Sequence, residues 1–422
     1  MKKRLLLTAA LSLALLSAGC GGSSTDAPGA VDISAPQDGG TAQEEELPET
    51  ENWGSAPDYK STLITTTSIR YLSVTAGASA DQIQMTWFSP SETAGQVFLT
   101  SPDDTEFADA TLFDASVSPS EEISGYYINR ATVTGLTPGT EYLYRVGGGE
   151  DLSPAYTYTA PEDSDSFRFT AVGDPQLGKP ADRLDTQKNT WHKVLNKIHY
   201  HFPDTSLLVS LGDQVNDYDD TEQYNAFLNQ GVLYNLALAP VKGNHDAGNH
   251  AYSEHFTLPN QSSLGVCDDE GDGDYWFVRG NALFLVLDVI DSSRWAEHAE
   301  FIAAACEANP DARWRIVFSH YSPYNSYESY LENAQNLRPY YLDFTSAYDI
   351  DLVMCGHDHS YMRSHFIQAD GSYLEYESPA VDPEGTMYLT LSSSSGSLYH
   401  NPTAQNEAAV AKKVKAPQVT DV

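Results

Sequence analysis

Five short apolar segments beyond residue 165 each end in a turn that carries side chains suited to binding a metal. The residues at these ends are, in chain order, Gly173-Asp174-Pro175-Gln176, Gly212-Asp213-Gln214, Gly243-Asn244-His245-Asp246, Ser319-His320 and Gly356-His357-Asp358-His359. In open α/β sheets, ligands collect beyond the carboxyl ends of the strands, and glycine lets the backbone turn closely beneath a bound ion. We therefore expect the turns to meet in one crevice. Its candidate ligands are Asp174, Asp213, Asn244, His320, His357 and His359.

This set of ligands predicts a particular kind of metal site. Carboxylate, amide and imidazole groups without a thiolate suit manganese, iron or zinc. Six protein ligands are too many for one catalytic ion with open positions, but they fit two ions bridged by a carboxylate. Two ions ~3.5–4 Å apart neutralise phosphoryl oxygens and lower the pKa of a shared water towards ~7, which promotes in-line displacement at phosphorus.

Composition limits the partners. The chain has 422 residues, of which 41% are hydrophobic and 19% charged, as in ordinary globular proteins. Its 23 Lys and Arg against 59 Asp and Glu give a net charge of −36, which repels nucleic acid polymers. A small anionic substrate is still compatible, because bound cations dominate the field inside a metal site.

Strands and helices alternate from residue 165 onward. Apolar runs predict strands at 167–172, 206–211, 238–241, 315–318, 351–355 and 385–391, and a hairpin at 275–287. Helical spacing predicts helices at 184–202, 224–232, 293–307 and 339–348. We expect residues 165–422 to form an α/β domain with two layers of sheet and helices outside them.

Residues 58–160 are different, because their short segments alternate with period two and lack helical spacing. This pattern predicts an all-β sandwich, which a polar stretch at 161–166 separates from the α/β domain. The stretch Thr134–Val146 resembles the E–F corner of fibronectin type III modules. It is most similar to the version that precedes purple acid phosphatase catalytic domains, where it would act as a spacer or as one wall of the active-site mouth.

The five strand-end motifs, in this order, resemble those of the calcineurin-like metallophosphoesterases, and the sandwich in front points to the purple acid phosphatase branch. The resemblance implies hydrolysis of phosphate esters, as in a phosphomonoesterase or acid phosphatase. A binuclear metal centre would supply a metal-bound hydroxide as nucleophile, without a covalent enzyme intermediate. Two alternatives are open: a phosphodiesterase or nucleotidase of the same superfamily, and a surface adhesin or binding protein that kept the fold without activity.

Roles follow from the resemblance by position. Asp174, Asp213 and His359 would bind the first metal of such a centre. Asn244, His320 and His357 would complete the ligands of the second metal, with Asp213 bridging the two. His245 would face the phosphoryl group as hydrogen-bond donor or general acid. Asp246 would either orient His245 by fixing its tautomer or cap a local turn.

Two positions depart from the family pattern. Asn216 stands where purple acid phosphatases have a metal-binding tyrosine, so no tyrosinate–iron colour is expected. Gln176 stands where many members have histidine, and it either ligates the first metal weakly or hydrogen bonds to the loop or substrate. Among the other histidines, His250 and His255 either reach the crevice mouth or are structural, and His298 and His400 have no assigned role.

The N-terminus predicts export. Residues 1–4 are basic and 5–18 are apolar, which is the layout of a signal peptide over 1–19 and too short to span a bilayer. The stretch Leu16–Cys20 resembles a bacterial lipoprotein signal, so we expect Cys20 to carry lipid; a plain secretory signal is the alternative. Residues 20–57 are an acidic, disordered linker. The chain is then exported, facing the periplasm or cell surface, with lipid as its membrane anchor.

Several points stay open at this stage. Cys267 and Cys306 are candidates for a disulfide, but connectivity cannot be derived from sequence. Residues 401–422 are polar and contain no strong apolar run, which leaves the last strand of the sheet in doubt. A small phosphorylated substrate is the expected partner, while the native metal pair and the oligomeric state are undetermined.

Overall fold

The structure is a computed structural model, and it describes residues 6–7, 63–64, 67–162, 164–266, 273–291, 293–376, 380–381, 383–403, 409–414 and 420–421. The predicted lipidation site Cys20, the predicted linker and Cys267 lie outside these residues, as does the signal segment apart from a short strand β1 (Leu6–Leu7) that pairs with β20 (Ala380–Val381). No helix among the described residues is both long and apolar enough to cross a bilayer.

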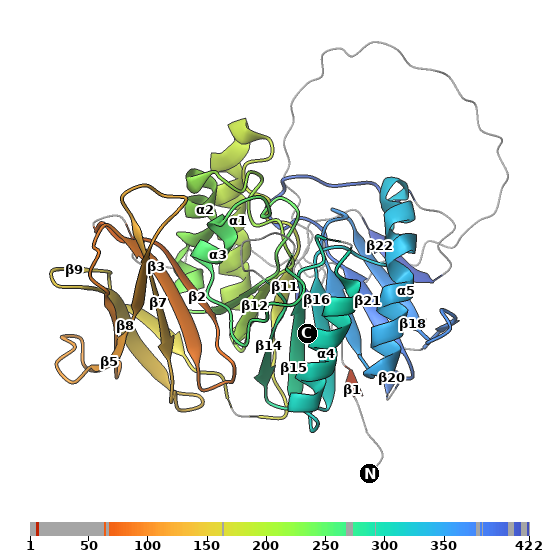
Figure 1. Ribbon diagram of the computed structural model, residues 1–422, viewed down its shortest axis with the longest axis horizontal. Coiled ribbons are helices and arrows are strands. Elements are labelled where there is room, and N and C mark those ends of the chain that lie inside the picture. The colour runs from red at the N-terminus through yellow and green to blue at the C-terminus, as the bar shows by residue number, and fades with distance from the viewer. Residues whose placement is uncertain are drawn as a thin grey trace.

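The N-terminal part is rich in sheet (Figure 1). Its strands are β2 (Arg70–Ala76), β3 (Ile83–Ser89), β4 (Gln96–Thr100), β5 (Thr111–Asp114), β6 (Ser116–Pro119), β7 (Tyr127–Val133), β8 (Glu141–Gly148), β9 (Asp151–Leu152) and β10 (Tyr156–Thr159). One sheet has the order β10-β8-β4-β5, and β2, β3, β7 and β6 belong to the other. Alternate residues such as Met85, Trp87, Tyr144 and Val146 are buried in the core, as period two requires. The expected sheet-rich domain is confirmed, and its fibronectin type III identity stays a prediction.

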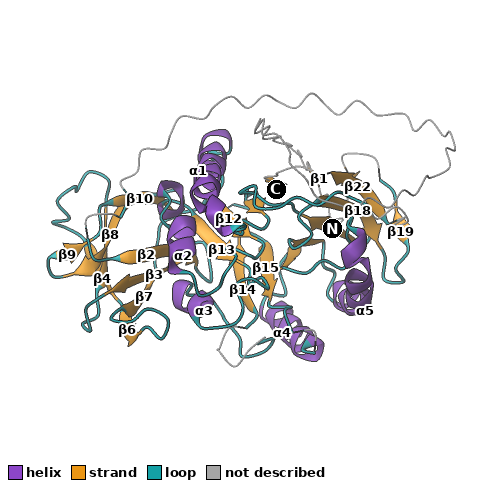
Figure 2. Ribbon diagram, turned by 90° about the horizontal axis from the view of Figure 1, so that it is seen from above, coloured by secondary structure: helices purple, strands orange, loops and turns teal. Residues whose placement is uncertain are grey.

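The α/β part has two sheets with helices on their outer faces (Figure 2). Its helices are η1 (Ala181–Arg183), α1 (Leu184–His201), α2 (Thr221–Leu228), η2 (Gly231–Tyr234), α3 (Ala251–His255), α4 (Trp295–Ala308), η3 (Glu328–Tyr330) and α5 (Leu331–Ala347). Its strands are β11 (Thr170–Val172), β12 (Leu207–Ser210), β13 (Ala237–Pro240), β14 (Tyr275–Arg279), β15 (Ala282–Leu287), β16 (Trp314–Ser319), β17 (Leu352–Cys355), β18 (Tyr361–Ile367), β19 (Tyr373–Leu374), β21 (Thr386–Thr390), β22 (Val410–Val414) and β23 (Thr420–Asp421).

Strand β15 shows why the layers stack in this order. Its whole length is buried, so both of its faces must find apolar partners. Leu283, Leu285 and Leu287 belong to the core that includes residues of α4 and α5, whereas Phe284 and Val286 belong to the core between the sheets. There, the Phe284 ring lies 5.5 Å from that of Phe169, which precedes β11.

The two domains share one sheet. Strands β23-β11-β12-β13 continue through β2-β3-β7-β6, because β13 pairs with β2 in parallel. A single pair of Cα partners, Leu238 and Thr75, makes this junction. The sequence shows no sign of it, since one ladder position between distant segments leaves no periodic pattern.

The polar C-terminal residues do form strands. Strand β22 pairs with β18, and β23 pairs with β11. Edge strands are held by backbone hydrogen bonds and tolerate polar side chains, so the apolar run that the sequence analysis looked for is not needed. Helix α5 also begins at Leu331, earlier than the predicted 339, with Pro339 inside it.

Candidate metal centre

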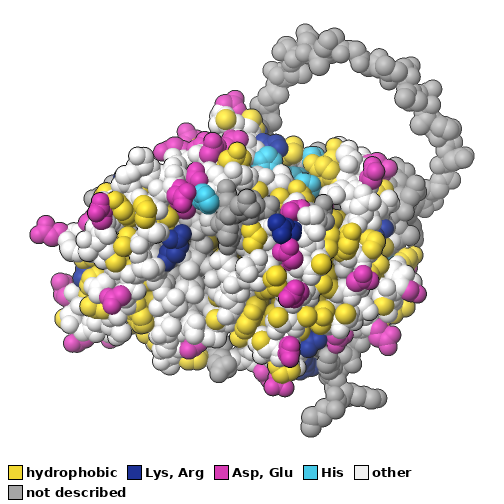
Figure 3. Space-filling model, viewed as in Figure 1, with side chains coloured by type: hydrophobic (Ala, Val, Ile, Leu, Met, Phe, Trp, Pro, Cys, Tyr) yellow, Lys and Arg dark blue, Asp and Glu magenta, His cyan; other side chains and the backbone are white. Residues whose placement is uncertain are grey.

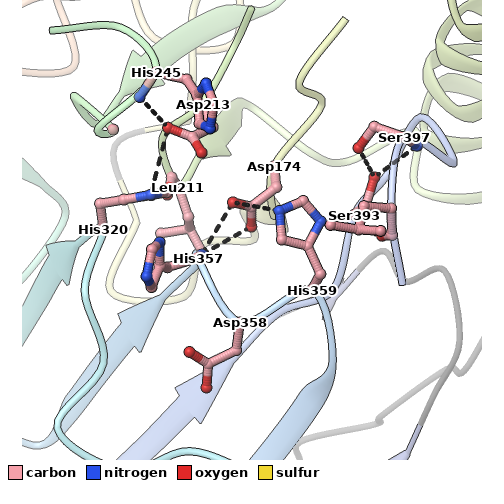
Figure 4. A network of polar contacts seen from close by, with 12 residues as sticks. Asp174, Leu211, Asp213, His245, His320, His357, Asp358, His359, Ser393 and Ser397 are labelled. Atoms are coloured by element: carbon pink, nitrogen blue, oxygen red, sulfur yellow. Dashed lines mark hydrogen bonds and ion pairs between the residues drawn. The ribbon is translucent and has the colours of Figure 1, made fainter. Parts of the chain in front are cut away.

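The five predicted turns meet at one edge of the two sheets. Strands β11, β12 and β13 are parallel to one another, and β16 is parallel to β17, so their carboxyl ends point the same way within each sheet. The turns that follow β11, β12, β16 and β17 converge from both sheets (Figure 4). Histidine side chains also appear close together at the upper rim of the face seen in Figure 3.

A first group of ligands consists of Asp174, Asp213 and His359. Each offers an atom that lies within 4.8 Å of the others, and all three residues are buried. His359 Nε2 lies 3.8 Å from Asp174 Oδ1. His359 Nδ1 donates to the carbonyl oxygen of Leu398 at 3.0 Å, which fixes the tautomer and leaves Nε2 for a ligand.

A second group converges on Asp213 from the other side. His320 Nε2 lies 3.4 Å from Asp213 Oδ1 and 3.1 Å from Asn244 Oδ1. His320 Nδ1 donates to the carbonyl oxygen of Leu211 at 2.8 Å, so this imidazole also turns Nε2 towards the site. Asp213 is thus common to both groups.

His357 is close to this second group through its ring. The ring centroid lies 5.1 Å from that of His320. Its backbone N–H donates to both carboxylate oxygens of Asp174 at 3.0 Å, which ties the two loops together. The intervening Asp358 points away from the site (Figure 4).

His245 lies over Asp213, and a backbone carbonyl orients it. Its backbone N–H donates to Asp213 Oδ1 at 2.8 Å. Its Nδ1 donates to the carbonyl oxygen of Asn216 at 2.7 Å. The carboxylate of Asp246 instead accepts from the backbone N–H groups of Gly243 and Gln214. Asp246 thus caps the turns at Gly243 and Gln214, and its role in orienting His245 stays a prediction.

Gln176 is completely buried beside these groups. Its backbone N–H donates to the carbonyl oxygen of Asp213 at 2.6 Å. Neither its Oε1 nor its Nε2 has a hydrogen-bond partner among the described residues. A buried amide without partners costs free energy, so this side chain is suited to an additional ligand in the crevice.

The backbone of the site is held in an uncommon conformation. The φ angles of Asp174, Gln176, Asp213, His357 and His359 are +38°, +37°, +52°, +68° and +49°. Non-glycine residues rarely adopt positive φ, and such strain gathers at functional sites. Gly212 has a φ of +95°, and a Cβ there would lie 2.3 Å from His320 Nδ1.

Burial and neighbouring charges have opposite effects on the pKa values of the ionisable groups at the site. Burial, reinforced by the negative charge of Asp213, raises the pKa of Asp174 well above its usual range. Burial would raise the pKa of Asp213 as well, but the positive charge and hydrogen bond of His320 lower it. Burial disfavours the charged form of His320, yet the charges of Asp213 and then Asp174 raise its pKa to about 10. A proton on His320 Nε2 thus compensates the buried carboxylates, and a bound cation would take over this role when it displaces that proton.

These features fit bound cations. Cations between Asp174 and Asp213 would neutralise two buried carboxylates that otherwise repel each other. Burial lowers the pKa of His357 to about 3 and that of His359 to about 4, which keeps both imidazoles neutral, as metal ligands must be. The residues present therefore suit a metal centre with a shared carboxylate.

Aromatic residues that the sequence analysis did not place surround His357. The Tyr330 ring stacks on His357 at 4.6 Å and 25°, and Tyr321 meets it edge-on at 4.5 Å. His400 donates from Nδ1 to the carbonyl oxygen of Asp358 at 3.0 Å, and its ring stacks on Tyr327. Tyr321 directly follows His320 of the fourth motif, so the sequence does place it near the site. Tyr327, Tyr330 and His400 come from the segments after β16 and β21, and no spacing in the sequence links these three to the metal motifs.

The histidines that follow the third metal motif lie against other parts of the protein. His255 is buried against Tyr71 and Phe88 of the N-terminal domain. His250 lies near Glu121 of the same domain. His298 forms a buried pair with Asp274, with His298 Nδ1 2.8 Å from Asp274 Oδ2, away from the metal motifs. Cys306 is a free, buried thiol, while Cys267 is outside the described residues.

Two family models match the chain. Residues 167–361 match the calcineurin-like phosphoesterase family. Residues 69–160 match the purple acid phosphatase N-terminal domain. The two matches adjoin each other, and the first spans all five metal motifs.

Curated relatives and a solved structure agree with these matches. An uncharacterized protein of Mycobacterium tuberculosis is 25% identical over 275 residues, covering 56% of this chain and 51% of that protein. A purple acid phosphatase of Glycine max is 23% identical over 298 residues, covering 64% and 60%. The chain thus aligns with about half to three-fifths of the length of these relatives.

The fold is similar to that of a solved purple acid phosphatase from Lupinus luteus seeds. The TM-score is 0.64 at 17% identity, covering 85% of this chain and 70% of the lupin chain. At that identity the likeness concerns the fold alone. The comparisons thus find similarity to calcineurin-like phosphoesterases over residues 167–361, and to the purple acid phosphatase N-terminal domain over residues 69–160 in front of them.

Proposed function

We propose that this protein is a metal-dependent phosphoric ester hydrolase with a binuclear centre. The observation that carries the proposal is the shared position of Asp213, which lies with Asp174 and His359 on one side and with His320 and Asn244 on the other. A carboxylate common to two ligand groups is the arrangement that two-metal hydrolysis requires. Matches to phosphatase relatives support the same reaction class.

The metal ions would supply Lewis-acid chemistry, by neutralising the phosphoryl oxygens and activating water for in-line attack on phosphorus. We assign Asp174, Asp213 and His359 to the first ion. Asn244, His320 and His357 would complete the set for the second ion, and Asp213 would be common to both sets. Iron, manganese and zinc all suit these oxygen and nitrogen ligands.

We assign the donation of a proton to the leaving oxygen to His245. His245 Nδ1 must carry a proton, because the carbonyl oxygen of Asn216 can only accept. When the ring is protonated, Nε2 is a second donor and can pass its proton to the leaving oxygen as the ester bond breaks. The backbone bond to Asp213 holds this donor beside the metal ligands.

A direct test compares hydrolysis of aryl phosphate monoesters and diesters by protein loaded with manganese, iron or zinc. Asp213→Asn should lose hydrolysis and reduce bound metal, because a neutral amide bridges two cations poorly. Asp219→Asn, an exposed residue of the loop after β12, is the matched control and should leave both unchanged.

The outcomes separate the candidates. A preference for diesters would favour the phosphodiesterase alternative. A folded protein that binds no stoichiometric metal would favour the adhesin. Full activity in Asp213→Asn would refute the bridging assignment.

We also propose that the chain is exported and anchored by lipid on Cys20. The basic, then apolar, N-terminus and the small residues before this cysteine support the proposal. Expression in a bacterium with radioactive palmitate should label the wild type and not Cys20→Ala. Equal labelling of the two would refute it.

A further inference from the structure

A loop of the N-terminal domain grips the segment that follows the third metal motif. Residues 120–122, between β6 and β7, contact residues 249–254, which include helix α3. We call these two segments together the domain clasp. Its second segment begins four residues after His245, next to the turn that carries the predicted site residues Asn244, His245 and Asp246.

Two glutamates, one in each segment of the domain clasp, accept hydrogen bonds from the other segment. Glu122 accepts from Asn249 Nδ2 at 2.6 Å and from the backbone N–H of His250 at 3.0 Å. Glu254, which is buried, accepts from Ser120 Oγ and from the backbone N–H of Glu121, both at 2.6 Å. Hydrogen bonds to charged acceptors contribute more than neutral ones, so this exchange makes a firm connection.

The opposite side of the same loop is held by the loop after β12. His245 Nδ1 donates to the carbonyl oxygen of Asn216. Gly248 has a φ of +137°, and a Cβ there would lie 2.6 Å from Cε1 of Tyr218. Residues 245–250 therefore contact the loop after β12 on one side and residues 120–122 of the N-terminal domain on the other.

We propose that Glu122 is a positioning residue, through which the N-terminal domain holds His245 in place over the metal centre. Asn249 is fixed by two hydrogen bonds, because its Nδ2 is bound to Glu122 and its Oδ1 accepts from the backbone N–H of Ala251. The effect reaches His245 along the backbone of residues 246–248, which joins Asn249 to His245. The N-terminal domain would thus contribute to catalysis through a residue that is not a metal ligand. The inference rests on the proposed function, since it assigns an effect on that reaction.

The test exploits the role of His245 as proton donor. If the general acid is displaced, hydrolysis of esters with poor leaving groups, such as glycerol phosphate, should slow the most. Hydrolysis of p-nitrophenyl phosphate should slow less, because its leaving group needs little protonation. We expect Glu122→Ala to lower kcat for glycerol phosphate roughly tenfold, a part of the 10²–10⁴-fold that a positioned acid contributes. Its kcat for p-nitrophenyl phosphate should fall by less than threefold, with bound metal unchanged.

Two further variants sharpen the result. Glu122→Gln keeps the shape but presents an amide N–H₂ to Asn249 or His250, so it should show an intermediate effect and remain folded. Glu92→Ala is the matched control, because Glu92 also accepts a hydrogen bond within the N-terminal domain, from Tyr127, but is not part of the clasp. It should leave both kcat values at the wild-type level.

A merely structural clasp would lower the folded fraction and reduce both kcat values by the same factor, which would overturn the proposal. Hydrogen exchange gives a readout that does not need activity. Glu122→Ala should speed exchange at the amides of 245–250 while leaving β12 protected, and unchanged exchange there would also overturn it. If the wild type hydrolyses neither ester, the proposed function fails instead, and the exchange experiment still decides whether the clasp holds the loop.

Discussion

His255 makes the stability of the protein depend on pH. The side chain is completely buried between the domains, where its ring stacks on Tyr224 at 4.0 Å and 7°. The ring centroids of Tyr71 and Phe88 lie 5.0 and 4.9 Å from that of His255. Nδ1 donates to the carbonyl oxygen of Ala251, and Nε2 has no partner among the described residues. Protonation would therefore place an uncompensated charge inside an aromatic contact.

The direction and size of the effect follow from linkage. Burial, the main cause, and the charge of Arg130 lower the pKa of His255 from 6.5 to about 4 in the folded state. A lowered pKa of a base means that the unfolded state binds the proton more tightly. The stabilisation is thus present in full above pH 6.5 and is lost as the pH falls towards 4. The loss between pH 7 and pH 5 is about 2 kcal/mol, at about 1.4 kcal/mol for each unit of pKa difference.

Urea unfolding at pH 7, 6 and 5 tests this prediction with His255→Phe, which keeps an aromatic ring but cannot titrate. Acid also protonates the metal ligands, but that contribution is common to both proteins and cancels in the difference. We expect the free energy of unfolding of the variant to fall by about 2 kcal/mol less than that of the wild type. His365→Phe is the control, because His365 is half-buried and its ring also stacks on a tyrosine, Tyr373. Equal losses in wild type and His255→Phe would refute the reasoning and would mean that cation–π attraction to Tyr224 offsets the cost of burial.

Three other predictions concern the metal centre. Gly212→Ala should bind metal roughly tenfold more weakly, since its Cβ would displace the His320 ring; metal titration followed by calorimetry checks this. A chelator should lower the melting temperature, and metal at 100 times its Kd should restore about 2.7 kcal/mol, a gain that scanning calorimetry would measure. Iron-loaded protein should lack a tyrosinate charge-transfer band in its visible spectrum, because Asn216 donates its side-chain amide to Asp217 and offers no phenolate. A purple colour would show that another tyrosine reaches the iron.

The fold was predictable where periodicity is strong. Helix α1 begins at Leu184 as predicted, because Trp191, Val194, Leu195 and Ile198 recur at helical spacing on its buried face. The prediction of α5 was wrong at its start, because the helix begins at Leu331 and continues through Pro339. Packing of Ala334 and Leu337 under the helix outweighs the lost hydrogen bond.

The candidate site was predictable for a different reason. A strand that ends in glycine and a ligand puts that ligand at a known edge of the sheet, so Asp174 and Asp213 could be brought together from sequence alone. Contacts made by loops are not encoded in this way. The orientation of His245 by the Asn216 carbonyl involves a backbone atom, which no residue type reveals. The grip of Glu122 on Asn249 joins segments of two domains, and nothing in either segment indicates the other.

Strain and charge at the centre point to one cause. Five site residues hold positive φ angles, each at a cost of about 1–3 kcal/mol, and two carboxylates are buried close together. A fold keeps residues in such unfavourable states only where surrounding contacts or a bound ligand hold them there. The apolar cores reach the strand ends that lead into these turns, but most of their side chains, such as those of β15, lie outside the turns. Cations at the centre would offset the charge repulsion directly, so removing them should loosen the turns before the sheets. Hydrogen exchange that rises at 174–176 and 357–359, while β15 stays protected, would establish that order, and uniform exchange across both would refute it.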